Sequence, residues 1–186
     1  MSLFNRRTFL ATGAATALSG PALASASTYV VPDHLKPRIV DIKSQFRPGE
    51  IHVDPGQFAL YWTLPGGEAI RYPVGIGTDQ RYSAGTFTIK RKAEWPRWTP
   101  TKAMIRREPH IYAQHAAGMA GGGANPLGAR ALYLYRGGRD TYLRIHGTPK
   151  PRTVEARVSN GCVRMINEHV IDLYNRVPNG TRVVLH

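Results

Sequence analysis

The chain has 186 residues, 42% of them hydrophobic, which suffices for one ordinary core but leaves two full domains marginal. Its formal net charge of +13 favours anionic polymers as partners, but no basic run is interleaved with stacking aromatic residues, so we expect no nucleic-acid partner. The single cysteine, Cys162, excludes an intramolecular disulfide and a thiolate metal cluster.

Residues 1–26 resemble an export signal. Arg6 and Arg7 precede a mildly apolar stretch, residues 9–23, which ends in small residues typical of a cleavage site. The arginine pair is typical of the twin-arginine route, with an ordinary secretory signal as the alternative. The stretch is shorter than the roughly 20 apolar residues of a membrane-spanning helix. We therefore expect cleavage, no stable membrane insertion and a periplasmic mature protein.

The mature chain is predicted to be mainly β. Residues 27–48 form a proline-containing leader segment with one candidate edge strand at residues 39–42, and the compact domain begins near Gly49. Apolar runs separated by turn signals predict meander-like hairpins. The predicted strands cover residues 51–53, 58–64, 69–74, 86–90, 131–135, 142–146 and 181–185.

Helices are predicted to be few. Asn167 can cap a helix that places Val170, Ile171, Tyr174 and Val177 on one face and ends before a Pro-Asn-Gly turn. The glycine-rich loop at residues 118–128 lacks the helix and the Lys-Ser/Thr pair of a phosphate-binding loop.

Two tryptophans, Trp95 and Trp98, lie in a segment with two prolines, which excludes a central strand. We expect both indole rings to cover the core, since burying a large aromatic group needs no functional reason. A lid or the wall of a groove is the alternative.

A histidine and the only thiol fall at predicted strand ends. His146 ends the apolar strand at residues 142–146, and Cys162 follows a flexible turn at residues 159–161. Strand ends hold reactive groups rigidly and leave them open to solvent. None of the seven histidines forms a helical His-Glu-x-x-His pair, so we expect neither a metal nor another cofactor.

These residue types suit nucleophilic catalysis. A free thiol has a pKa of about 8.5 and is mostly protonated at neutral pH unless a nearby imidazole stabilises the thiolate. With His146 beside it, Cys162 can attack an acyl carbon while the imidazole carries protons in both half-reactions. Taken singly, each residue has an ordinary alternative: a small buried cysteine, a satisfied histidine and a solvated Arg164.

The ordered combination is more specific. His-Gly-Thr at residues 146–148 and Ser-Asn-Gly-Cys-Val-Arg at residues 159–164 resemble the catalytic motif of the L,D-transpeptidases with a YkuD-type domain, and Cys162 follows His146 by 16 positions, as in that family. Other similar segments lie at residues 72–77, 85–87, 95–98 and 125–128. The resemblance implies a YkuD-like β-sandwich or barrel-like catalytic domain with a few short helices over residues 49–186.

Seven residues have expected roles, and the resemblance implies those of Cys162, His146 and Gly147. Cys162 is the expected nucleophile and His146 the acid and base. Gly147 is expected to orient the imidazole through its carbonyl, and backbone amides around Gly161 and Cys162 to stabilise the oxyanion. The residues expected to bind substrate are Ser159, Asn160 and Arg164, the last through its planar fork. Pro149, where Asn is common, and Ala156, where glycine often occurs, depart from the family pattern.

The implied reaction cuts a peptidoglycan stem after its third residue, releases D-alanine and leaves a thioester on Cys162. An amine from another stem gives a cross-link, an amine from a lipoprotein gives an anchor, and water makes the enzyme a carboxypeptidase. Carbapenem-type inhibitors are also expected ligands. The rival classes are an NlpC-type thiol hydrolase, a sortase-like enzyme and a non-catalytic wall-binding module. The order and spacing of His146 and Cys162 argue against the first two.

Overall fold

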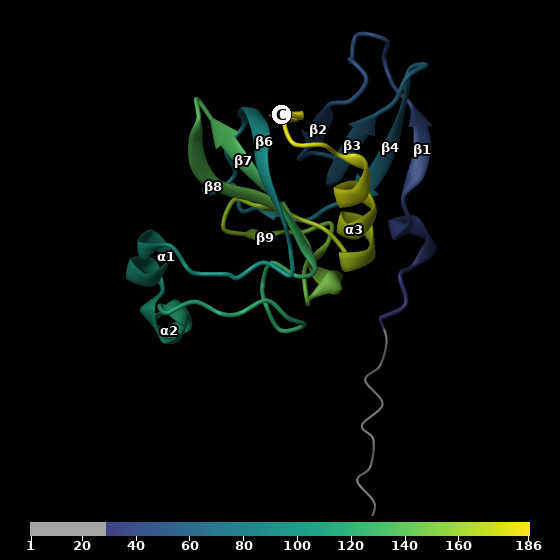
Figure 1. Ribbon diagram of the computed structural model, residues 1–186. Helices are drawn as coiled ribbons and strands as arrows, with labels where there is room; N and C mark the ends of the chain where they lie inside the picture. Colours follow the sequence, from purple (N-terminus) through teal and green to yellow (C-terminus); the bar gives the residue numbers. More distant parts are fainter. Residues whose placement is uncertain (1–28) are drawn as a thin grey trace, which may run out of the picture.

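The computed structural model describes residues 29–186, and in this part of the chain nine strands form one curved sheet (Figure 1). The predicted export signal at residues 1–26 lies outside the described residues. The strands are β1 (Arg38–Asp41), β2 (Ile51–Asp54), β3 (Ala59–Thr63), β4 (Glu68–Pro73), β6 (Gly85–Glu94), β7 (Arg130–Arg136), β8 (Arg139–His146), β10 (Val163–Arg164) and β11 (Arg182–Leu185). Their order across the sheet is β1-β4-β3-β2-β11-β6-β7-β8-β10.

The sheet curls until its edge strand β10 reaches the segment that follows β4. Gly75, just after β4, exchanges two backbone hydrogen bonds with Arg164 of β10, at 2.8 and 2.7 Å. A second, two-stranded sheet of β5 (Ile76–Gly77) and β9 (Arg157–Ser159) lies beside this junction. The inward side chains, including Leu60, Ile89 and Ile145, form the main core. The predicted mainly β, barrel-like fold with a few short helices is confirmed.

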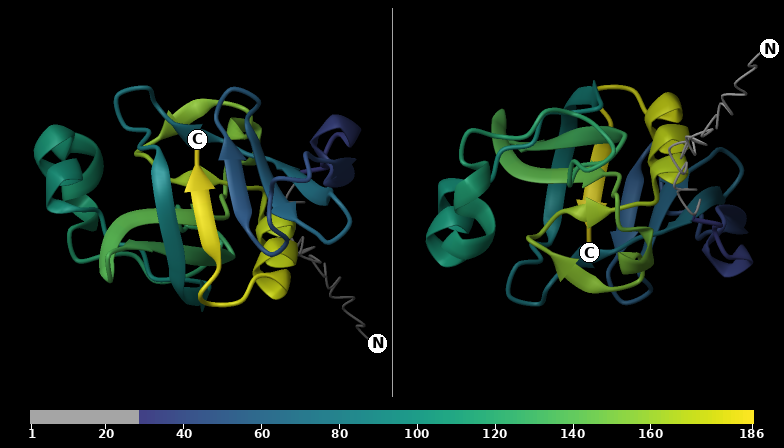
Figure 2. Two further views of the ribbon diagram at one scale, coloured as in Figure 1. Left: turned by 90° about the horizontal axis from the view of Figure 1, so that it is seen from above. Right: turned by 90° about the horizontal axis from the view of Figure 1, so that it is seen from below.

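The helical segments lie on two sides of the sheet. They are η1 (Asp33–Leu35), α1 (Lys102–Arg107), α2 (Pro109–Tyr112), η2 (Ala113–His115), η3 (Pro151–Thr153) and α3 (Asn167–Arg176). Both views of Figure 2 show α1 and α2 projecting from one side of the body, while α3 packs on the opposite side. Val170 and Leu173 of α3 are fully buried in the main core.

The predicted helix cap at Asn167 is wrong. The N-cap position of α3 is Ile166, and no side chain caps the helix. The Asn167 Oδ1 instead accepts hydrogen bonds from the backbone amides of Ala129, at 3.0 Å, and Thr148, at 3.2 Å. Asn167 therefore ties the loop after His146 to the loop before β7.

The two tryptophans do not cover the core. Trp95 is 49% exposed, and neither ring belongs to the hydrophobic core clusters of the described residues. The Trp98 ring instead lies 6.3 Å from the ring of Tyr112 and 5.7 Å from that of His115. Trp98 therefore supports the α1–α2 segment, and the expectation that both rings seal the core is wrong.

Lys92 of β6 caps the C-terminal end of α3. Its Nζ donates to the carbonyls of Tyr174, at 2.6 Å, and Val177, at 2.7 Å, and lies 4.2 Å from the centre of the Tyr174 ring. A cation suits the negative end of the helix dipole, and hydrogen bonds from charged donors are the stronger kind. We predict that Lys92→Met lowers the free energy of unfolding by about 2 kcal/mol in urea titrations. The exposed Lys90→Met is the control, and equal losses in both variants would contradict the capping role.

Candidate active site

Neighbouring parallel strands carry the histidine and the cysteine. Val163 of β10 pairs with Ile145 of β8, and Arg164 pairs with His146. Val163 and Ile145 point into the core, at 1% and 0% exposure. Because side chains alternate along a strand, His146 and Arg164 share the opposite face. Cys162, one residue before β10, continues that face, so it is a diagonal neighbour of His146.

The His146 imidazole is held in one tautomer. Its Nδ1 lies 2.6 Å from the carbonyl oxygen of Gly147. A carbonyl can only accept, so Nδ1 carries the hydrogen and Nε2 of the neutral ring is free to take a proton. The Gly147 carbonyl thus holds the imidazole in this tautomer.

Burial sets the charge of this imidazole. His146 is 4% exposed, and burial, reinforced by the positive charge of Arg164, lowers its pKa to about 4. The hydrogen bond to Gly147 opposes this shift without cancelling it. The ring is therefore neutral at pH 7, as a general base requires.

The Cys162 thiol is half-buried beside β8. Its Sγ lies 3.8 Å from the carbonyl oxygen of Tyr142, to which the S–H donates, and the hydrogen bonds of residues 29–186 include none between Sγ and the imidazole. Burial raises the pKa of the Cys162 thiol, against the opposing effects of the Arg144 amide and of the charges of Arg144 and Arg164. The resting site thus holds a neutral thiol beside a neutral imidazole, rather than the thiolate expected from the sequence.

Ser159 and Gly161 fix the turn before Cys162. The Ser159 hydroxyl donates to the Cys162 carbonyl, at 2.6 Å, and accepts from the Gly161 amide, at 3.2 Å. Ser159 is 3% exposed, so the structure places it where it shapes the turn rather than where it faces a substrate. Because the Gly161 amide is already engaged, the Cys162 amide is the better candidate oxyanion donor.

Asn160 ties the same turn to the α1–α2 segment. Its Oδ1 accepts from Arg81, at 2.8 Å, and from Arg107 of α1, at 2.5 Å, while its Nδ2 donates to the Tyr112 hydroxyl of α2, at 2.9 Å. Glu108 lies 3.4 Å from Arg107 and 3.8 Å from Arg81. The α1–α2 segment therefore borders the candidate site, and Asn160 couples it to the turn before Cys162.

Arg164 has unused donors next to the thiol. Its Nη1 donates to the Thr153 hydroxyl, at 3.0 Å, whereas its buried Nε has no partner among the described residues. No carboxylate of residues 29–186 forms an ion pair with it. Burial lowers the pKa of Arg164, though an arginine stays charged.

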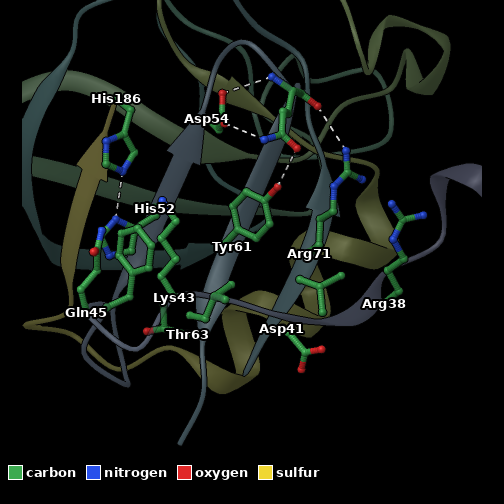
Figure 3. Close-up of a pocket in the computed structure, with 14 residues that line it drawn as sticks. Arg38, Asp41, Lys43, Gln45, His52, Asp54, Tyr61, Thr63, Arg71 and His186 are labelled. Atoms are coloured by element: carbon green, nitrogen blue, oxygen red, sulfur yellow. Dashed lines mark hydrogen bonds between the residues drawn. The ribbon is translucent and has the colours of Figure 1, made fainter. Parts of the chain in front are cut away.

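A separate groove of about 740 Å³ lies across the outer face of β1 to β4. Figure 3 shows Tyr61 on its floor and His52 beside His186, whose ring nitrogens are 3.0 Å apart. Its other lining residues are Arg38, Val40, Asp41, Ile42, Lys43, Gln45, Phe46, Asp54, Gln57, Thr63 and Arg71. None of the predicted site residues lines this groove, and it offers no thiol.

Residues 29–186 hold no candidate metal site and no candidate membrane-spanning helix. No group of three or more His, Cys, Asp and Glu side chains there could hold a metal ion. None of the helices in this part of the chain is long and apolar enough to cross a membrane.

The buried His146 makes stability depend on pH. Its pKa is about 4 in the folded chain against 6.5 for an ordinary histidine, so the unfolded chain binds the proton more readily between these values. The stabilisation is complete above pH 6.5 and is lost as the pH falls toward 4. We predict a loss of roughly 3 kcal/mol from this group, measured as the free energy of unfolding in urea.

His146→Gln is the control for this prediction, because glutamine does not titrate. His52 and His169, whose pKa values are also lowered by burial, retain their own contributions in the variant. Identical pH slopes for wild type and variant between pH 4 and 6.5 would contradict the buried neutral state of His146.

Comparison with known proteins identifies relatives of the whole domain. The family model described as the L,D-transpeptidase catalytic domain, YkuD, matches residues 48–185. The probable L,D-transpeptidase ErfK/SrfK of Escherichia coli strain K12 is 31% identical over 168 residues, which cover 89% of this chain and 49% of that protein. The chain therefore spans about half the length of this curated relative.

Solved structures share the fold. A Brucella melitensis protein described as a probable carnitine operon oxidoreductase, caia, is 46% identical with a TM-score of 0.58, covering 84% of this chain and 96% of its own. The L,D-transpeptidase LdtMt1, solved in complex with imipenem, has 15% identity and a TM-score of 0.51, covering 73% of this chain and 57% of its own. The second likeness concerns the fold alone.

Proposed function

Since the chain belongs to the YkuD family of L,D-transpeptidase catalytic domains, we propose that it transfers acyl groups of peptidoglycan stem peptides through a thioester on Cys162. One observation carries this proposal. His146, with Nδ1 bound to Gly147 and Nε2 free, lies diagonally beside Cys162 on the neighbouring strand. A base and a thiol so placed can form and resolve an acyl-enzyme.

The first half-reaction follows from the protonation states of the two groups. His146 Nε2 takes the thiol proton as the sulfur bonds to the carbonyl carbon after the third stem residue. The imidazolium then gives that proton to the amine of D-alanine as the C–N bond breaks. The Cys162 amide is the proposed donor to the oxyanion, at a position fixed by Ser159 and Gly161.

The second half-reaction reverses the proton transfers. Neutral His146 removes a proton from the acceptor amine as its nitrogen attacks the thioester, and the departing sulfur takes the proton back. An amine on a second stem gives a cross-link, one on a lipoprotein gives an anchor, and water gives a tripeptide stem. Water as the acceptor makes the protein an L,D-carboxypeptidase, which is the second candidate activity.

Charge supports a carboxylate-bearing substrate. Within residues 29–186 the buried Nε of Arg164 has no partner, and the chain as a whole carries +13. We assign Arg164 to a carboxylate of the donor stem, and the positive surface to anionic wall polymers. Export by the signal at residues 1–26 would deliver the enzyme to the periplasm, where such polymers lie.

The test is incubation of the protein with disaccharide-tetrapeptide, followed by mass spectrometry of the products. Wild type should release D-alanine and yield cross-linked dimers or tripeptide stems, whereas Cys162→Ala should yield neither. The product separates transfer from hydrolysis, and a lipoprotein added as acceptor tests anchoring. Identical product patterns for wild type and variant would exclude an enzymatic role for the thiol and favour a non-catalytic wall-binding module.

A further inference from the structure

Strand β8 bulges next to the thiol. The β7–β8 register shifts between Tyr133 and Tyr135, and Tyr142 has a φ of 61°. This left-handed conformation is uncommon for a bulky residue and has to be held by its surroundings. Asp140 Oδ1 holds it by accepting from the Tyr142 amide at 2.8 Å, and the bulge turns the Tyr142 carbonyl toward the Cys162 sulfur.

The same carboxylate holds a guanidinium. Asp140 Oδ1 lies 2.6 Å from Arg144 Nη1, and Oδ2 lies 2.8 Å from Nη2, a bidentate pair. The Arg144 guanidinium also stacks 4.2 Å from the centre of the Tyr133 ring, and the Arg91 guanidinium lies 4.0 Å from the same ring centre. The Arg144 side chain is only 11% exposed, so it has little freedom to move.

This fixed cation lies on the reactive face. Arg144 lies two residues before His146 on β8, so both side chains are on the same face of the sheet. Cys162, just before the neighbouring strand β10, is on this face too. A largely buried ion pair of this kind is weak evidence for stability, because desolvation offsets much of the attraction. The position of the ion pair beside the Cys162 sulfur points instead to an effect on the thiol.

We propose that Asp140 and Arg144 form a positioning pair for Cys162: the carboxylate fixes the guanidinium and the Tyr142 carbonyl, and the fixed cation stabilises the thiolate left when His146 takes the proton. The inference rests on the proposed role of Cys162 as nucleophile. The step balances, since the S–H bond breaks, the sulfur keeps the electron pair, and the proton moves to Nε2 of the imidazole.

The other charges near the sulfur set the direction of the effect. Arg144, Asp140 and His146 face it from β8 and Arg164 from β10. The Arg144 charge lowers the pKa of the thiol more than the Asp140 charge raises it, and the Arg144 amide adds to the lowering. Loss of the guanidinium charge should therefore leave less thiolate at any pH below the pKa of the thiol.

The experiment uses the single cysteine of the chain as its own reporter. The rate of alkylation by iodoacetamide is measured by intact-protein mass spectrometry from pH 5 to 10 for wild type, R144Q, R144K and R139Q. R144Q should react roughly tenfold more slowly at pH 7, with its profile moved up by about one pH unit. R144K keeps the charge but loses the bidentate fork, so it should show a smaller shift in the same direction. R139Q, exposed on the same strand, should match wild type.

A folded R144Q whose profile superimposes on that of wild type would overturn the proposal. If R144Q does not fold, R144K provides the test. An unchanged R144K profile would show that the bidentate contact with Asp140 is not needed and would overturn the positioning role. The readout needs no transpeptidase activity. A shifted R144Q profile in a protein that neither processes tetrapeptide nor reacts with imipenem would refute the proposed function and leave the positioning pair intact.

Discussion

Replacing His146 by glutamine is expected to slow acylation of Cys162 by roughly two to four orders of magnitude at pH 7. The neutral thiol of the resting site needs a base before it can attack, and the Nε2 of His146 is the proposed base. The measurement is the rate at which imipenem or disaccharide-tetrapeptide adds to the protein, followed by quenched intact-mass spectrometry. His34→Gln, an exposed histidine on η1, is the matched control and should react at the wild-type rate.

The pH dependence of the same rate tests the state of the imidazole. Because the pKa of His146 is about 4, the wild-type acylation rate should hold through pH 6 and fall only as the pH approaches 4. The descending acid limb should vanish in His146→Gln. An acid limb centred near 6.5 would show an ordinary solvated histidine and contradict the buried neutral base.

Gly161→Ala is expected to have the second largest effect. Gly161 has a φ of 114°, and an added Cβ would lie 2.7 Å from the Arg81 carbonyl oxygen. A side chain there has to distort the backbone and push the turn away from residue 81. Since that turn carries Cys162, we expect the acylation rate to fall at least 100-fold, as happens when reacting groups are displaced by about 1 Å. The free energy of unfolding should fall by about 2 to 4 kcal/mol.

Gly180→Ala is the control that separates the cost of backbone strain from the effect of displacing a turn. Gly180 has a φ of 93°, but nothing lies within 4 Å of its hypothetical Cβ. Gly180→Ala should therefore cost only the strain of the left-handed conformation, about 1 kcal/mol, and should leave acylation unchanged. If both variants lose the same stability and neither loses activity, the close packing of the nucleophile turn is not what positions Cys162.

The positions of the proposed catalytic pair, His146 and Cys162, could be predicted from the sequence because their signals are local. The apolar strand ending at His146 and the turn preceding Cys162 are both visible in short windows of sequence, and the structure places both residues on one face of adjacent strands. The main strands were predictable for the same reason, since each alternates or runs apolar between turn residues.

The surroundings of the pair depend on contacts that no short window contains. Asn160 meets Arg81, Arg107 and Tyr112 across 79, 53 and 48 positions of the chain. The cap predicted at Asn167 failed for a related reason, because amides 38 and 19 positions away compete for its side-chain oxygen. Local propensity gives no sign of such partners.

The ion pair between Asp140 and Arg144 could not be predicted from the sequence either. The spacing of the two residues is visible in sequence, but on a regular strand residues four apart are too distant for a bidentate ion pair. The bulge at Tyr142 brings them together, and a bulge at a non-glycine residue has no clear sequence signature. The surroundings of Trp98 could not be predicted either, because only the folding of residues 95–128 brings its partners in α2 and η2 close to it.

The most direct test of the central claim is to trap the acyl-enzyme. Wild-type protein mixed with disaccharide-tetrapeptide is quenched in acid within the first turnover, digested and mapped by mass spectrometry. The adduct should equal the stem without its D-alanine, reside on the peptide that contains Cys162, and disappear when an acceptor amine is added before quenching. Turnover of the stem with Cys162 unmodified throughout, or with the Cys162→Ala variant equally active, would contradict the thioester mechanism.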